Sequence, residues 1–172
     1  MRNNSITKLL KIPEYRVTEI LTIGDKEIHI KVEAYKRKKT ICSNCKKEHQ
    51  KGHHGAREIT VRDLPLGERQ VYIHVDKKRS RCPEDEKTHV EEIEWVKVRG
   101  RVTRRMAEKV NRLTAITTNK EAGWYLGMDD EVVYRIDKEV LEEQAKQRLE
   151  PIPSGENLSI DEVSYLKYHR YL

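Results

Sequence analysis

The sequence predicts an α+β protein with a β-rich first part and an all-α second part. Two observations carry this prediction. Up to about residue 98, apolar residues alternate with polar ones at the period of two that is typical of strands. After residue 100 they recur three and four apart, which is the spacing of one helix face. We therefore place a β-rich domain at residues 1–98 and a helical domain at 99–149, and we treat residues 150–172 as a third segment.

Four strands are predicted in the first part. Residues 16–23 and 27–34 form a hairpin around Gly24-Asp25, and residues 58–62 and 70–75 flank a turn at 63–67. His29 lies on the polar face of its strand, so we expect a surface residue. His74 lies between Ile73 and Val75, so we expect an ordinary strand residue rather than a ligand.

The three cysteines indicate a metal site. Cys42 and Cys45 are two residues apart, a spacing at which both thiolates bind one Zn²⁺. Cys82 follows the basic run 77–81, and two hairpins that bring cysteines together are typical of a zinc ribbon. Four protein ligands leave no open position, so the predicted zinc is structural. The alternative is a reduced surface pair of thiols.

A histidine is needed as the fourth ligand. We predict His89, because it follows Cys82 by seven residues and a short loop separates the two. His49, four residues after Cys45, is the alternative. The remaining candidates are His53, His54 and His74.

The second part predicts a helix-turn-helix. Thr103 is a plausible N-cap for a helix that presents Met106, Val110 and Leu113 on one face. A second helix spans 119–126 and ends at Gly127. A third begins after Asp129 and continues to about residue 149. Gly123 supplies the small residue that crossing helices require, and the apolar residues that hold the third helix are Val133, Ile136, Val140 and Leu141.

The third helix is the predicted recognition helix. Tyr134, Arg135 and Lys138 are its predicted DNA-binding residues, with Arg135 suited to guanine and Lys138 to phosphate. Asp130 and Glu131 argue against DNA binding by this helix, because acids repel phosphates. Glu131 also complements the helix dipole. The alternative is a small helical bundle with ordinary surface charges.

Composition and charge agree with a nucleic-acid partner. Of the 172 residues, 37% are charged and 36% are apolar, and the net charge is +6. The basic excess lies upstream of residue 149, which favours a polyanion partner. The N-terminus lacks the apolar stretch of a signal peptide, and no segment reaches membrane-spanning length. We expect a cytoplasmic protein that does not bind membranes, and both a monomer and a homo-oligomer are open alternatives.

The last segment contains one candidate catalytic residue. Residues 151–157 have the composition of a linker, and residues 158–165 predict a strand that carries Asp161 and Glu162. Neighbouring residues on a strand point to opposite faces, so these two carboxylates do not bind one metal together.

The order of these parts resembles the DDE transposases of the ISL-three family of prokaryotic insertion sequences. The resemblance includes the CxxC knuckle at Cys42, a turn like residues 62–65, the basic run that ends in Cys82, the helix-turn-helix and the segment 160–165. It implies that Asp161 is the first carboxylate of the DDE triad, on a truncated first strand of an RNase H-like domain. It also implies double-stranded DNA, the terminal inverted repeats, as partner, and Mg²⁺ as a cofactor of the complete parent enzyme alone. His89 departs from the family, which shows a cysteine there.

The sequence therefore predicts the DNA-binding N-terminal region of a transposase. The chain ends at Leu172, before two of the three carboxylates, so we expect no catalysis from it alone. The alternatives are a stand-alone zinc-ribbon and helix-turn-helix transcriptional regulator and, less favoured, a zinc-stabilised protein-interaction module.

Overall fold

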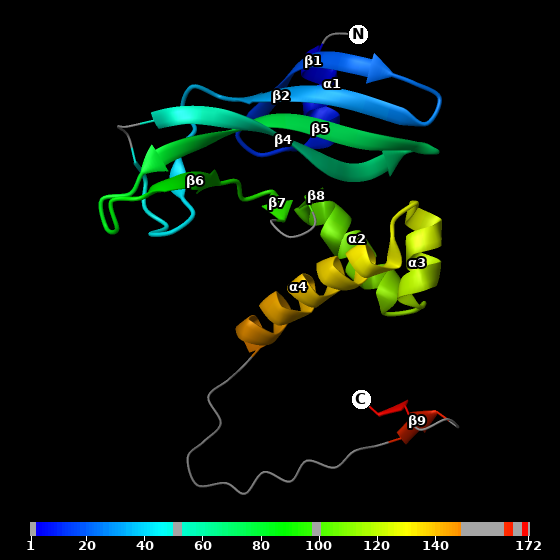
Figure 1. The fold of residues 1–172 in the computed structure, drawn as a ribbon. Coiled ribbons are helices and arrows are strands. Elements are labelled where there is room, and N and C mark those ends of the chain that lie inside the picture. Colours follow the sequence, from blue (N-terminus) through cyan, green and yellow to red (C-terminus); the bar gives the residue numbers. More distant parts are fainter. Residues whose placement is uncertain (1–2, 50–52, 98–100, 149–163, 167–169, 172) are drawn as a thin grey trace, which may run out of the picture.

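A twisted sheet and a three-helix unit pack against each other in the computed structural model (Figure 1). The structure describes residues 3–49, 53–97, 101–148, 164–166 and 170–171. Predicted features outside these ranges include the catalytic candidate Asp161 and the linker 151–157. Within the described ranges, no helix is long and apolar enough to cross a bilayer.

Two antiparallel hairpins form the main sheet. β1 (Tyr15–Ile23) pairs with β2 (Glu27–Ala34), and β4 (His53–Leu66) pairs with β5 (Arg69–Arg81). A parallel pairing of β2 with β5 joins the hairpins, which the sequence analysis did not foresee. The sheet continues through β8 (Val102–Thr103) to β7 (Val96–Lys97), in the order β1-β2-β5-β4-β8-β7.

The second hairpin is longer than predicted. We expected a loop at 47–56, a turn at 63–67 and a basic run beyond the strand at 77–81, but residues 53–56, 63–66 and 77–81 belong to strands β4 and β5, and the tight turn is at Gly67. Pairing with the partner strand overrides the local polar composition, because each backbone group gains a hydrogen bond. The extension carries the end of β5 to Cys82, beside β3 (Ile41–Cys42) and β6 (Thr88–Glu92).

One face of the sheet carries the first hydrophobic core. Ile28, Ile30 and Val32 are buried while the residues between them are half-exposed, so the predicted alternation of β2 is confirmed. Helix α1 (Asn3–Leu10), which was not predicted, covers part of this face with Ile6 and Leu10. The core residues are Tyr15, Val17, Ile28, Ile30, Val32, Val61, Val71, Ile73, Val75, Ile93, Trp95 and Val96.

The three helices enclose a second core. They are α2 (Arg104–Thr114), α3 (Asn119–Leu126) and α4 (Asp130–Arg148). Thr103 caps α2, as predicted, since its side chain accepts a hydrogen bond from the Met106 N–H. Thr118 and Glu121 form a capping box at α3. The core residues are Val102, Met106, Ala107, Val110, Ala122, Leu126, Val133, Ile136 and Val140.

A buried carboxylate joins the two cores. Asp63 on β4 is 1% exposed and accepts hydrogen bonds from the Thr103 hydroxyl at 2.7 Å and from Arg105 Nε at 2.7 Å. The Nη2 atom of Arg105 donates to the other carboxylate oxygen of Asp63. The Nη1 atom of Arg105 donates to the Leu10 carbonyl at 2.6 Å. The N-terminus of α2 is thereby attached to the sheet and to α1. The expected domain boundary at 98/99 lies between β7 and β8, which are paired strands of this sheet.

The last described residues form a separate ribbon. β9 (Ser164–Leu166) pairs antiparallel with β10 (Arg170–Tyr171). The strand predicted at 158–165 is described only from Ser164 onward. An RNase H-like sheet is not formed by these described strands.

Removing the junction carboxylate should destabilise the protein. We expect Asp63→Ala to lower the free energy of unfolding by about 3 kcal/mol, because it leaves the Arg105 guanidinium and the Thr103 hydroxyl without their buried partner. Urea unfolding measures this change. Arg16→Ala is the control, since the Arg16–Glu33 pair is more than half exposed and is worth less than about 1 kcal/mol. Equal losses in the two variants would contradict the assignment of Asp63 as the junction.

A methyl group at Gly123 should disturb the helical unit. A Cβ there would lie 2.7 Å from the Met128 carbonyl oxygen, so Gly123→Ala should cost about 1–3 kcal/mol despite the helix preference of alanine. Gly24→Ala is the matched control, because a Cβ at Gly24 meets only the Glu27 oxygen at 3.5 Å. Thermal unfolding compares the two, and an unchanged midpoint for Gly123→Ala would refute the close approach.

Candidate metal centre and nucleic-acid interface

Two tight turns present the cysteine sulfurs. In the first, the Lys46 N–H donates to the Cys42 carbonyl at 3.0 Å, and Lys46 adopts a left-handed φ of 60°. In the second, the Cys82 N–H donates to the Lys87 carbonyl at 2.8 Å. The Ser43 N–H bonds the Val90 carbonyl of β6, so the first turn is attached to the strand that follows the second. The β-structure thus brings the two turns together.

Four side chains converge between these turns. The sulfurs of Cys42, Cys45 and Cys82 and a ring nitrogen of His49 lie within 4.8 Å of one another. Cys42 and Cys82 are fully buried, and no disulfide joins the three cysteines. Three thiols and an imidazole at this separation are the donor set that Zn²⁺ prefers in tetrahedral structural sites, so the residues fit the ion.

The thiols are electrostatically suited to a cation. Burial acts to raise the pKa of Cys42, but hydrogen bonds from the backbone N–H groups of Cys45 and Asn44 and from the neighbouring thiols outweigh it and lower the pKa. Burial and the adjacent Cys82 and Cys42 sulfurs raise the pKa of Cys45. Adjacent thiolates repel each other, and a divalent ion between them removes that penalty.

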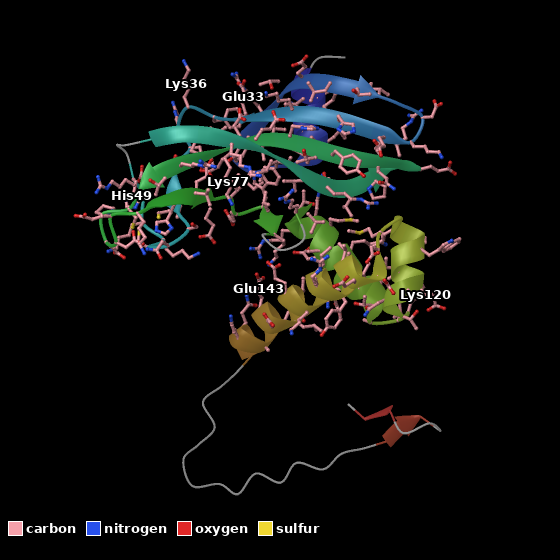
Figure 2. All side chains as sticks on the ribbon, in the orientation of Figure 1. Glu33, Lys36, His49, Lys77, Lys120 and Glu143 are labelled. Carbon is pink, nitrogen blue, oxygen red and sulfur yellow. The ribbon has the colours of Figure 1, made fainter. Side chains whose placement is uncertain are left out.

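The structure does not bring His89, the predicted fourth ligand, into this cluster. The Cys82 turn closes at Lys87, so His89 already lies in β6, paired opposite Ser80. Its Nε2 contacts the Asp85 carboxylate at 2.7 Å instead. His49, labelled in Figure 2, takes the fourth position, with its Nε2 3.1 Å from the Cys45 sulfur. The geometry therefore supports His49, the alternative ligand four residues after Cys45.

Comparison with known proteins agrees with this cluster. Residues 38–85 match the family described as the zinc-finger of transposase IS204/IS1001/IS1096/IS1165. The matched range contains Cys42, Cys45, His49 and Cys82, and it ends before His89. Residues 38–85 are therefore similar to the zinc ribbons of these transposases. The resemblance to ISL-three transposases is confirmed, and the ribbon with its Cys₃His cluster supports a structural zinc.

A longer match extends the similarity. The chain is 32% identical over 117 residues to the transposase for insertion sequence element IS1001 of Bordetella parapertussis. The match covers 64% of this chain and 27% of that protein, so the chain spans about a quarter of the relative. No solved structure matches significantly. These findings support a transposase-related role.

The two segments predicted to form a helix-turn-helix are the helices α3 and α4, which a short turn joins. Gly127 ends α3 in the left-handed conformation, with a φ of 60°, which is why a glycine suits this turn. Ala122, Leu126, Val133 and Ile136 are buried between the helices. The observed α4 begins at Asp130, one residue after the predicted cap, and the Glu131 N–H donates to the Asp129 carboxylate at 2.9 Å.

Arg62 holds this turn against the sheet. Its guanidinium donates to the Gly127 carbonyl at 2.9 Å and also to the Leu126 carbonyl. These carbonyls belong to the C-terminus of α3, where the helix dipole favours a cation. From the sequence, Arg62 was expected at the end of the strand 58–62, and this role was not predicted. A local pattern contains no indication of a bond between residues 64 positions apart.

The predicted DNA-contacting residues share the outer face of α4. Tyr134 is 51% exposed, and Arg135 and Lys138 are exposed as well. Arg135 makes one long hydrogen bond to the backbone of its own helix, 3.4 Å to the Glu131 carbonyl. Among the described residues, neither Arg135 nor Lys138 has an ion pair. Their charges are therefore available to a polyanion.

Two acids of α4 have partners within the protein. Asp130 accepts from the Glu131 N–H at 3.0 Å, so it helps to cap its own helix. Asp137 accepts from Asn111 and Thr114 of α2, each at 2.8 Å. These contacts give two carboxylates of α4 a role within the protein, whereas the exposed Glu131 carboxylate has no hydrogen bond or ion pair among the described residues.

Zinc content tests the revised ligand set. We expect the purified protein to bind one Zn²⁺ per chain, and His49→Ala and Cys45→Ser to lower this content and destabilise the β-ribbon, because each removes one of four ligands. Elemental analysis after gel filtration measures it. His89→Ala is the control and should retain full zinc; loss of zinc in that variant alone would restore His89 as the ligand.

Proposed function

We propose that this chain is the DNA-recognition part of a transposase and that it binds the ends of its insertion sequence. The observation that carries the proposal is the outer face of α4, where Tyr134, Arg135 and Lys138 lie together without acidic partners. In a helix-turn-helix this face enters the major groove, which is about 12 Å wide and admits a helix. We assign base contact to Arg135 and phosphate contact to Lys138.

The sheet would act as the support of the recognition helix. Asp63 fixes the start of α2, Arg62 fixes the α3–α4 turn, and both side chains come from β4. Lys97 on β7 is 5% exposed and pairs with Glu143 farther along α4. A helix held at its beginning and along its length keeps a defined angle to the DNA, which preorganises the contact.

The zinc ribbon would contribute a second, less specific contact. Lys36 and Arg37 precede the first cysteine turn, are exposed, and form no ion pair with any residue that the structure describes. Other cations of the ribbon are neutralised, such as Lys46 by Glu92 at 2.6 Å and Lys47 by Glu84 at 2.7 Å. We therefore expect phosphate contacts from the segment before Cys42 rather than from the whole ribbon surface.

A catalytic role is predicted only from the resemblance to DDE transposases. If the chain continues as in its relatives, Asp161 would be the first of three carboxylates that bind Mg²⁺, which would support in-line attack on a phosphodiester. The proposed binding to the terminal inverted repeats is supported by the exposed Arg135 and Lys138 of α4 and by the similarity to a transposase.

DNA binding of α4 variants tests the proposal. Arg135→Ala should weaken binding to a duplex that carries the flanking inverted repeat by about ten- to a hundredfold, and binding to random duplex much less. Lys138→Ala should weaken both equally and reduce the salt slope by about one. Fluorescence anisotropy at several salt concentrations measures these effects.

Arg16→Ala is the matched control, because it also removes one arginine, from β1, away from α4. It should leave both affinities nearly unchanged. Binding of the wild-type chain that ignores salt, or equal effects of Arg135→Ala and Arg16→Ala, would refute recognition by α4.

A further inference from the structure

Two neighbouring aromatic side chains of α3 are exposed to solvent. Trp124 is 85% exposed and Tyr125 is 65% exposed, whereas Trp95, the other tryptophan of the chain, is buried in the core of the sheet. A large aromatic side chain stabilises most when it is buried, because burial removes about 150–250 Å² from water. Helix α3 buries Ala122 and Leu126 toward the other helices, so packing within the chain leaves these two rings uncovered. The function proposed above does not use them.

A leucine at the end of the sheet adds to this apolar surface. The β4–β5 turn lies beside the C-terminus of α3 (Figure 1), since Arg62 of β4 bonds the Gly127 carbonyl and a Cβ at Gly127 would lie 2.7 Å from Gln70 Nε2 of β5. Leu66, the last residue of β4, is 67% exposed. We call this surface the α3 patch, and it consists of Trp124, Tyr125 and Leu66.

The charged residues around the α3 patch argue against a polyanion as its partner. Lys120 and Glu121 are exposed on α3, and Asp129 and Asp130 are exposed just after it. The backbone of Asp130 lies against α3, 3.5 Å from the position of a Cβ at Gly123. Three carboxylates against one ammonium repel DNA and anionic lipid. Aromatic residues are enriched in the cores of protein–protein interfaces, so the α3 patch suits a protein surface.

We propose that the α3 patch binds a second copy of this chain, with the two α3 helices antiparallel across a two-fold axis. A two-fold interface uses the same surface on both copies, so this surface must be complementary to itself. With the axis between Trp124 and Tyr125, Trp124 of one copy packs on Tyr125 of the other. Contacts between aromatic rings are favourable beyond the area that they bury.

The charges at the two ends of α3 are complementary in this arrangement. Lys120 and Asp129 are each four residues from the aromatic pair, so the antiparallel pairing sets Lys120 of one copy opposite Asp129 of the other. Both side chains are exposed, and neither has an ion pair with any residue that the structure describes. In its own helix Lys120 lies in the first turn, where the helix dipole disfavours a cation. In the pair it lies near the C-terminus of the other α3, where the dipole favours a cation.

The exposed area suits a weak dimer. Trp124 and Tyr125 together expose about 300 Å² of side chain. With Leu66 and the flanking polar side chains, two copies bury about 1,000 Å² in total, which is the lower limit of specific interfaces. We therefore expect a dimer that forms with rising concentration rather than a permanent one. The α4 residues proposed for DNA contact take no part in it, so the dimer is independent of DNA binding.

Sedimentation velocity of the untagged, zinc-loaded chain over a wide concentration range tests the dimer. We expect the mass to rise from 20.4 kDa toward twice that value as the concentration increases. Trp124→Ala should raise the dissociation constant of the dimer about a hundredfold or more, because central aromatic residues dominate such interfaces. Tyr35→Ala is the matched control, since Tyr35 is also an exposed aromatic residue but follows β2, and this variant should dimerise like the wild type.

A charge exchange tests the antiparallel arrangement. Lys120→Glu and Asp129→Lys should each weaken self-association about tenfold or more, because each brings two pairs of like charges together. A mixture of the two variants should associate about as tightly as the wild type, since both contacts of the mixed dimer then join opposite charges. Thermal unfolding checks that each variant is folded, which matters for Asp129, because its carboxylate accepts from the Glu131 N–H.

Three results would overturn the proposal. The first is a wild-type chain that stays monomeric at every concentration, which is the outcome expected if a different protein covers the α3 patch. The second is a Trp124→Ala variant that dimerises as tightly as the wild type. The third is a mixture of the two charge variants that associates no more tightly than either variant alone.

Discussion

The carboxylate of Asp63 is the interaction on which the arrangement of this protein depends. It is buried at the end of β4, and it bonds both the N-cap of α2 and Arg105, whose guanidinium reaches back to the end of α1. A buried charge that loses its partner is costly, so the bonds are retained together or lost together. Because α2 packs on α3 and α4 through a common core, the position of its first turn sets the position of α4.

The β-sheet and the helical unit each bury a small hydrophobic core, and the two cores are built differently. The sheet buries one face under α1 and Trp95, and the helices bury a stripe of mostly small aliphatic side chains. The region around the cysteine turns has little apolar material of its own. A structural ion can supply folding energy there in place of a core. The buried Lys38–Glu91 pair, with Glu91 also accepting from the Lys78 N–H at 2.8 Å, adds a polar anchor beside it.

The positions of the charged residues matter more for the proposed DNA contact than the net charge does. Lys46 and Lys47 of the ribbon pair with nearby glutamates, Asp130 helps to cap α4, and Asp137 of α4 bonds α2. Among the described residues, Arg135 and Lys138 of α4 are exposed and have no ion pair. A net charge of +6 therefore understates the contrast between neutralised and available surfaces. This contrast, rather than overall basicity, is the basis of the proposed DNA contact.

Local sequence was enough to predict the elements whose cause is local: the alternation of β2, the Thr103 cap, Gly123 and Gly127 in the helical turn, and the pair Cys42 and Cys45. Both His49 and His89 remained candidate ligands, because both spacings allow a loop to reach the ion. The folded chain favours His49, because the β5–β6 pairing directs His89 toward Asp85. Only the tertiary structure decided α1, the parallel pairing of β2 with β5 and the Arg62 contact. Each depends on contacts between residues far apart in the chain, and no local periodicity encodes such contacts.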